Sequence, residues 1–226
     1  MPADRIARGR GADDRRHRTC GWHAYPGLGG FNLHEGPRAA FRSGADGPGR
    51  TAALFDDTDG LPVMLEIRDA GGAVLQRLTV EAPEAPPRDF VGERLRAEDL
   101  DGDGNLDLRV FAWAGATGNS GDFAWRWDAP SERYVEVPGF ANLSQVRVVP
   151  QTHCLTSHAR GGAAGMIAVD SLWCWRGSVL ENTRVVEHDV DANGNVIRIT
   201  GELRDGQLVE TDRLTIEPAK ETRTAE

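Results

Sequence analysis

The chain has 226 residues with a formal net charge of −9, including 27 Gly and 12 Pro. This length is enough for one domain with a sizeable core. The acidic balance argues against nucleic acid or an anionic membrane surface as the main partner. No run of about 18 apolar residues is present, so no membrane-spanning helix is expected.

Residues 1–50 show little periodicity and are expected to form a mostly disordered leader rich in Arg and Gly. Within this segment, residues 30–41 could supply one edge strand. Residues 1–30 lack the apolar stretch of about 7–15 residues that a signal peptide requires. We expect a single β domain over residues 51–217 and a frayed tail over residues 218–226.

The β pattern begins with a hairpin at residues 61–80. Val63, Leu65 and Ile67 alternate on one face, and the sequence Asp-Ala-Gly-Gly supplies the turn. A second clear strand at residues 123–128 places Phe123, Trp125 and Trp127 on one face and Ala124, Arg126 and Asp128 on the other.

Further strands are expected along most of the remaining domain, at residues 108–114, 133–137 and 145–149, within 165–190, and in a meander at 191–216. Residues 91–98 are the best place for one helical turn. Short strands with turns every 8–12 residues predict an all-β fold of antiparallel hairpins, in a small degenerate β-propeller-like or sandwich arrangement. Three acidic turns, at 56–60, 99–104 and 189–194, hint at repeated hairpin units.

The acidic stretch at residues 99–107 has the spacing of a calcium-binding loop. Calcium takes six to eight oxygen ligands, which carboxylates alternating along one tight turn can supply. A glycine is required at the sixth position for the sharp bend, and Gly104 occupies it. The expected ligands, from positions 1, 3, 5, 7 (a backbone carbonyl) and 9, are Asp99, Asp101, Asp103, Asn105 and Asp107.

This loop is not an EF-hand, because its twelfth position is Val110 rather than Glu and no flanking helices are expected. A Ca²⁺ cofactor is favoured over magnesium since no phosphate-binding motif accompanies the loop. Without the bidentate Glu, the expected affinity is weak, on the order of 10⁻⁵ to 10⁻³ M. The alternative is a plain acidic turn. Residues 189–197 repeat half of the pattern, and there a simple Asn-Gly hairpin is favoured.

Cys154 and Cys174 lie in expected strands, and Cys20 lies in the leader. In an exported protein Cys154 and Cys174 could form a disulfide, whereas in a cytosolic protein they would be buried thiols. Cys154, His158 and Cys174 could supply zinc ligands, but no Cys-x-x-Cys pair is present. His153, Cys154, Ser157 and His158 could suggest a catalytic nucleophile and base. No Gly-x-Ser-x-Gly or cysteine-protease motif surrounds them, so we expect no enzymatic activity.

The tryptophans favour a role in core packing over one as ligand platforms. The alternative is a carbohydrate- or cell-wall-binding module that uses the faces of Trp125 and Trp127. Arg126 and Arg160, near Gly-rich segments, are candidate contacts with a partner protein.

Residues 62–185 also resemble a known family in the order of their motifs. These are AEDLDGDGNLDL at 97–108, GATGNSGDFAWRWD at 115–128, RYVEV at 133–137, TSHARGGAAG at 156–165 and LWCWRGSVL at 172–180. The pattern is similar to that of periplasmic immunity proteins that inhibit peptidoglycan hydrolases delivered by Xanthomonas-type type IV secretion systems. The acidic loop is shared more broadly with FG-GAP/VCBS-type calcium-loop repeats.

The resemblance implies a β-propeller-like fold, a periplasmic or exported location, and a protein partner that is a peptidoglycan hydrolase. It also implies that Asp99, Asp101, Asp103, Asn105 and Asp107 hold calcium. The chain would then be a non-enzymatic calcium-binding inhibitor.

Overall fold

The computed structural model describes residues 34–42, 49–56, 62–80, 94–162, 166–204 and 207–216. They form an all-β structure with one short 3₁₀ helix, η1 (Phe140–Asn142). The strands are β1 His34–Arg42, β2 Gly49–Asp56, β3 Pro62–Asp69, β4 Val74–Thr79, β5 Leu95–Glu98, β6 Asp107–Ala114, β7 Ser120–Asp128, β8 Arg133–Glu136, β9 Arg147–Val149, β10 Cys154–Arg160, β11 Ala168–Arg176, β12 Val179–Val190, β13 Val196–Arg204 and β14 Gln207–Ile216.

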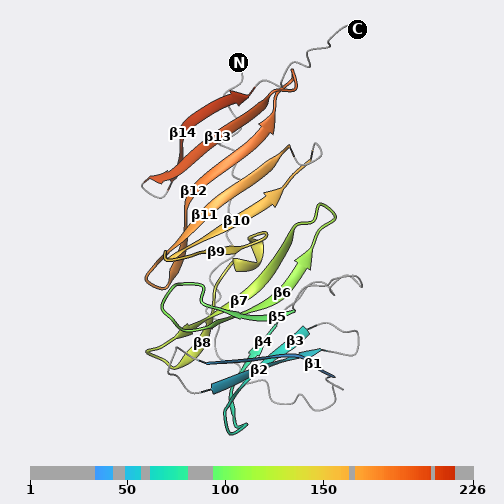
Figure 1. The fold of residues 1–226 in the computed structure, drawn as a ribbon, viewed down its shortest axis with the longest axis vertical. Coiled ribbons are helices and arrows are strands. Elements are labelled where there is room, and N and C mark those ends of the chain that lie inside the picture. The colour runs from blue at the N-terminus through green and yellow to red at the C-terminus, as the bar shows by residue number, and fades with distance from the viewer. Residues whose placement is uncertain are drawn as a thin grey trace, which may run out of the picture. The chain divides into compact units, whose positions relative to one another are not determined.

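The strands form three antiparallel sheets, and in each the strands follow one another in chain order (Figure 1). The sheets contain β1 to β4, β5 to β8, and β9 to β14. Every connection within a sheet therefore links neighbouring antiparallel strands, as hairpins do. Among the described residues, no strand pairing closes a sheet into a barrel. The predicted all-β class with antiparallel hairpins is confirmed.

The hairpin of β3 and β4 forms as its alternation predicts. Leu65 and Ile67 are buried in β3, and they pair with Leu78 and Gln76 of β4. Gly72 has a φ of 86° in the turn, a conformation that favours glycine. The Asp69 carboxylate accepts a hydrogen bond of 2.8 Å from the backbone N–H of Ala73, which closes the turn.

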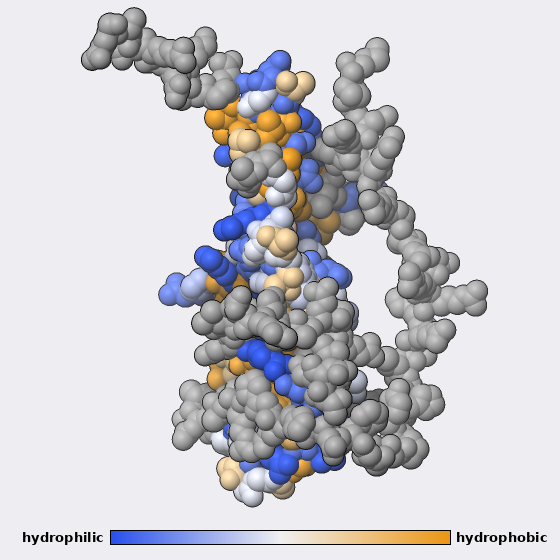
Figure 2. Space-filling model, turned by 90° about the vertical axis from the view of Figure 1, so that its right-hand side faces the viewer, coloured by the Kyte–Doolittle hydropathy of each residue, from blue (hydrophilic) through white to orange (hydrophobic). Residues whose placement is uncertain are grey.

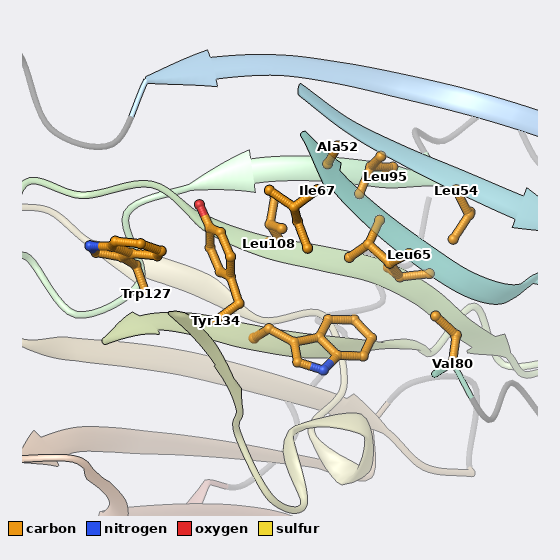
Figure 3. Packing of buried hydrophobic residues seen from close by; sticks show 11 residues of the cluster. Ala52, Leu54, Leu65, Ile67, Val80, Leu95, Leu108, Trp127 and Tyr134 are labelled. Atoms are coloured by element: carbon orange, nitrogen blue, oxygen red, sulfur yellow. The ribbon is translucent and has the colours of Figure 1, made fainter. Parts of the chain in front are cut away.

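The first hydrophobic core joins the β1–β4 sheet to the β5–β8 sheet (Figure 3). One side of it consists of Ala52, Leu54, Leu65 and Ile67 from β2 and β3. The other side contains side chains of β5 to β8: Leu95, Leu108, Val110, Trp125, Trp127 and Tyr134. The predicted face of Phe123, Trp125 and Trp127 is thus the face that β7 turns toward this core.

The second core joins the opposite face of the β5–β8 sheet to the β9–β14 sheet. Ala124 of β7 packs here, with Phe140 of η1, Leu155 of β10 and Trp175 of β11. The β5–β8 sheet is therefore covered on both faces. Six consecutive residues of β6, from Asp107 to Ala112, are buried as a result.

Some local predictions differ from the structure. Residues 95–98 form strand β5 rather than a helical turn, because they pair with β6. Residues 30–41 were predicted to supply one edge strand or none. The structure has β1 there, at the edge of its sheet. Residues 1–33 and the tail 217–226 lie outside the described residues. Among those that the structure describes, no helix is long and apolar enough to span a membrane.

The β9–β14 sheet exposes apolar side chains on its last strand, where Leu214 and Ile216 are 43% and 47% exposed. Figure 2 shows hydrophobic residues gathered at the upper end of the view, the end that β12 to β14 occupy in Figure 1.

The β9–β14 sheet also contains a disulfide between Cys154 and Cys174, which face each other in register on β10 and β11. Of the two alternatives for these cysteines, the structure shows the disulfide. For a loop of this length, a disulfide typically stabilises the fold by roughly 3 kcal/mol.

We expect Gly121→Ala to destabilise the fold. A Cβ at this position of β7 would lie 2.5 Å from Trp113 Nε1 and 2.7 Å from the backbone oxygen of Ala141. The Trp113 indole donates a hydrogen bond to that same oxygen, so neither group can move freely. Overpacking of this kind costs about 1–3 kcal/mol, measurable by urea unfolding. Gly162→Ala is the control, since no atom of the described residues lies within 4 Å of its added Cβ. Equal stability of the two variants would contradict this prediction.

Candidate metal centre

The acidic loop is the connection between β5 and β6. Glu98 at the end of β5 pairs with Asp107 at the start of β6, so residues 99–106 close a hairpin. Asp107 is thus both the ninth position of the loop and the first residue of a strand that is buried on both faces. The loop is thereby fixed at one end to the interior of the protein.

Three of the predicted ligands converge. Asp99, Asp101 and Asp107 each offer a carboxylate oxygen, and these oxygens all lie within 4.8 Å of one another. Ca²⁺–oxygen bonds of 2.3–2.6 Å place ligands on opposite sides of the ion about 5 Å apart. The donor set of three carboxylates and its spacing therefore fit a calcium ion.

Asp99 is held by the backbone of the loop. Its two carboxylate oxygens accept hydrogen bonds from the N–H groups of Gly102, at 2.7 Å, and Gly104, at 3.0 Å. Both glycines have positive φ values, 75° and 85°. The need for glycine at the sharp bend was predicted from the sequence at Gly104. The close approach at Gly102 was not predicted: a Cβ there would lie 3.1 Å from His153 Nδ1.

Asp107 is fully buried, and its carboxylate joins the loop to β7. One oxygen accepts a hydrogen bond from the N–H of Leu100 and the other from the N–H of Trp127, both at 2.8 Å. Neither contact brings a positive charge, and burial raises the pKa of Asp107 to about 8. A cation beside this carboxylate would offset the cost of burying its charge.

Asp101 is buried and pairs with a cationic side chain. Arg126 of β7 donates a hydrogen bond of 3.1 Å to Asp101 Oδ2. Burial raises the pKa of Asp101, and the contact with Arg126 opposes that shift. Arg126, predicted as a contact with a partner protein, is instead only 15% exposed and supports the acidic loop.

The structure does not bring Asp103 into the same group. Its carboxylate accepts hydrogen bonds from the backbone N–H and the side-chain amide of Asn105, at 2.7 and 3.0 Å. Asp103 and Asn105 therefore stabilise the turn in this structure. Their predicted ligand roles remain predictions.

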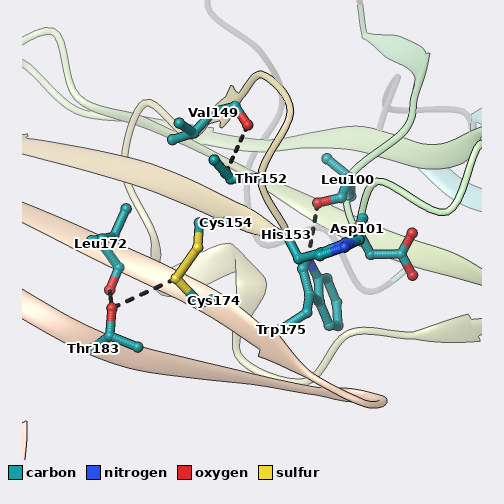
Figure 4. The surroundings of a disulfide bond; sticks show 10 residues. All are labelled: Leu100, Asp101, Val149, Thr152, His153, Cys154, Leu172, Cys174, Trp175 and Thr183. Carbon is teal, nitrogen blue, oxygen red and sulfur yellow. Dashed lines mark hydrogen bonds between the residues drawn. A yellow bond between two sulfur atoms is a disulfide. The ribbon is translucent and has the colours of Figure 1, made fainter.

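Trp175 of β11 and His153 of the turn before β10 hold the loop from outside, and neither role was predicted from the sequence. Trp175 Nε1 donates a hydrogen bond of 2.9 Å to the carbonyl of Leu100. His153 Nδ1 lies 2.5 Å from the carbonyl of Asp101, so Nδ1 carries the proton that is donated. His153 and Trp175 each adjoin a cysteine of the disulfide, as Figure 4 shows. The disulfide therefore keeps together the two side chains that bind successive loop carbonyls.

The second acidic turn forms the plain hairpin that its sequence favours. Asp191 accepts hydrogen bonds from the N–H groups of Asn193 and Asn195 and from the Asn195 side chain. Gly194 has a φ of 83°. Most of the third acidic turn, at residues 56–60, lies outside the described residues.

The other candidate chemical groups do not assemble. Cys154 and Cys174 are bonded to each other, so the set of Cys154, His158 and Cys174 cannot supply thiolate ligands to zinc. Ser157 is buried, and its hydroxyl exchanges hydrogen bonds with the backbone of Ser144. His158 instead contacts Asp170.

The predicted core packing is confirmed for Trp125 and Trp127, which are only 3% and 7% exposed in the first core, so the alternative of a ligand platform is wrong for them. A ring so covered by protein cannot stack on a glycan. Arg160 is exposed, and its backbone N–H and carbonyl both pair with the side-chain amide of Asn119.

The fold and this loop define an all-β protein of three stacked antiparallel sheets with an acidic, partly buried loop. No family model matches the chain, and no curated protein matches it significantly. A solved structure described as a Xanthomonas type IV secretion system related protein is similar in fold. It has a TM-score of 0.53 and 16% identity, over 77% of this chain and 93% of that one. A Bacteroides fragilis protein of unknown function aligns with a TM-score of only 0.28, at 8% identity, over 82% of this chain and 93% of that one.

We expect Asp107→Asn to destabilise the protein even in chelator. The amide keeps one acceptor oxygen, so either the Leu100 or the Trp127 N–H is left without a partner. A buried unpaired donor costs about 1–3 kcal/mol, measurable by thermal or urea unfolding in excess EGTA. Asp103→Asn is the matched control, because Asp103 bonds only within the turn. A loss seen with calcium but absent in EGTA would show that Asp107 acts through a metal alone.

Proposed function

We propose that this chain is a non-enzymatic, calcium-stabilised protein that acts in the periplasm or outside the cell by binding another protein. The observation that carries the calcium part is the convergence of the Asp99, Asp101 and Asp107 carboxylates within 4.8 Å. Calcium would bind these oxygens and fix the loop between β5 and β6. No chemical step is assigned to it.

Three observations support the location and the kind of activity. A disulfide is typical of proteins in oxidising compartments outside the cytosol. The fold is similar to that of a protein related to the Xanthomonas type IV secretion system. The candidate nucleophiles Cys154 and Ser157 are engaged in a disulfide and in backbone hydrogen bonds, which favours binding over catalysis.

The order of the sequence motifs extends the proposal to the partner. By its resemblance to periplasmic immunity proteins, the chain would bind a peptidoglycan hydrolase and inhibit it. The alternative, glycan binding through tryptophan faces, is not favoured because Trp125 and Trp127 lie in the core.

We expect Asp99→Asn to weaken calcium binding by about tenfold or more, since affinity in such loops follows the number of charged ligands. Isothermal titration of the chelator-treated protein with Ca²⁺ measures this. Asp99 is a better choice than Asp101, whose loss would also remove one of the two carboxylates that pair with Arg126.

Asp191→Asn is the matched control, in the acidic turn that gathers no ligand cluster, and it should leave the calcium titration unchanged. Absence of calcium binding by the unchanged protein at millimolar Ca²⁺ would refute the metal part of the proposal.

The proposed activity is tested with a purified peptidoglycan hydrolase, chosen first as one encoded beside this chain. We expect stoichiometric amounts of the chain to stop the clearing of a peptidoglycan suspension in calcium. The inhibition should be weaker in EGTA, provided that the hydrolase itself is active there. An unchanged clearing rate at excess chain, with calcium present, would count against inhibition of that hydrolase and favour a different protein partner.

A further inference from the structure

Three side chains on adjacent strands of the β9–β14 sheet meet at a place that the acidic loop does not include. They are His158 on β10, Asp170 on β11 and His188 on β12. His158 lies directly opposite Asp170, whereas His188 lies opposite Ala168, two residues before Asp170. Residues that pair across antiparallel strands lie on the same face of the sheet, so all three side chains share one face.

The two imidazoles approach different oxygens of a single carboxylate. His158 Nδ1 lies 2.7 Å from Asp170 Oδ1, and His188 Nε2 lies 3.6 Å from Asp170 Oδ2. The shorter distance is a hydrogen bond, and the longer one is not. The Asp170 carboxylate thus lies between two ring nitrogens.

This face of the sheet is turned away from the β5–β8 sheet. Leu155 and Ser157 lie on the opposite face of β10 from His158. Leu155 packs in the second core, and the buried Ser157 bonds to Ser144. The side chains of His158, Asp170 and His188 are 37%, 50% and 31% exposed. They are therefore open to solvent and can adjust their rotamers. Trp175, which contacts the acidic loop, lies on the opposite face of β11.

We propose that His158, Asp170 and His188 form a binding site for a divalent transition metal ion, with Zn²⁺ as its probe. Two imidazole nitrogens and one carboxylate oxygen are a donor set that zinc takes in sites that keep a fourth position open to water. It differs from the oxygen-only set of the acidic loop, which suits calcium. The proposal is therefore independent of the proposed calcium site and of the proposed inhibitor function.

The distances of the two imidazoles from Asp170 require only small movements, although they run to different carboxylate oxygens. The imidazoles must also rotate toward each other to share one ion, because among the described residues only Asp99, Asp101 and Asp107 have ligand atoms that all lie within 4.8 Å of one another. Zinc bonds of about 2.0–2.2 Å at tetrahedral angles place neighbouring ligand atoms roughly 3.3–3.5 Å apart. The separation of His188 and Asp170, 3.6 Å, is already close to this value. His158 must move away from Asp170 by roughly 0.6 Å from its present 2.7 Å, because the metal replaces the proton between them. When that proton moves to Nε2 of the same ring, Nδ1 is free to bind zinc.

The neighbouring strand sets the charge around the site. Arg198 of β13 lies opposite His188, and its guanidinium is 3.7 Å from the Asp212 carboxylate of β14. The positive charge of Arg198, on the strand next to His188, weakens metal binding, and the negative charge of Asp212 offsets part of that effect. We therefore expect weaker binding than at a closed structural zinc site with four protein ligands.

The test uses the full chain without an affinity tag, stripped of metal and then kept in saturating calcium. Titration with ZnCl₂ is followed by calorimetry, and Co²⁺ replaces Zn²⁺ in a second experiment that reads the visible absorption of a tetrahedral site. We expect one equivalent of Zn²⁺ to bind. The affinity should fall tenfold or more in His188→Gln and in Asp170→Asn, with loss of the Co²⁺ bands.

Asp99→Asn is the control that separates this site from the acidic loop, and it should bind Zn²⁺ as the unchanged protein does. All three substitutions affect partly exposed side chains, and circular dichroism checks that each variant is folded. Failure of the unchanged protein to bind Zn²⁺ would overturn the proposal and leave His158 and Asp170 as a cross-strand hydrogen-bonded pair. Zinc binding that survives both His188→Gln and Asp170→Asn would overturn it as well.

Discussion

The structure depends on the burial of both faces of the β5–β8 sheet. A strand covered on both sides has no face for solvent, so every polar side chain on it must find a partner inside the protein. β6 contains two such residues. Arg109, 3% exposed, pairs with Asp122 and Glu98, and Asp107 accepts two backbone hydrogen bonds. Removing Arg109 would leave the buried Asp122 with Arg96 as its remaining ion-pair partner, and a buried charge that loses a partner is destabilising.

The same constraint explains why the acidic loop has a defined geometry. Its last carboxylate, Asp107, is fixed inside the middle sheet, and its Leu100 and Asp101 carbonyls are bound by Trp175 and His153 of the next sheet. The loop is thus held from two sheets at once, and the disulfide at Cys154 and Cys174 joins the two strands that position the outer contacts. A loop held in this way has less conformational entropy to lose when its carboxylates gather around an ion.

The sequence predicts local features that follow from periodicity and turn chemistry. The alternation of Phe123, Trp125 and Trp127, the β3–β4 hairpin and the Asn-Gly turn at 193–194 are all present, because each depends on residues within one or two strands. The stacking of sheets depends on residues far apart in the chain. The sequence of β6 alone therefore did not predict that Asp107 and Arg109 are buried as Leu108 is. The roles of His153, Trp175 and Arg126 were missed for the same reason. Each contacts the loop from a position at least 25 residues away in the chain.

The proposed calcium site and the disulfide are consistent with the same compartment. A calcium site with the expected affinity, on the order of 10⁻⁵ to 10⁻³ M, is filled most readily where calcium is abundant, as it is outside the cytosol. A disulfide persists where the surroundings are oxidising, which is again outside the cytosol. In this protein the two features are physically connected, since the disulfide adjoins the residues that bind the loop carbonyls. In a reducing, calcium-poor cytosol the loop would lose its proposed ion, and the strands that support it would lose their covalent link. Both features are thus compatible with the proposed site of action outside the cytosol.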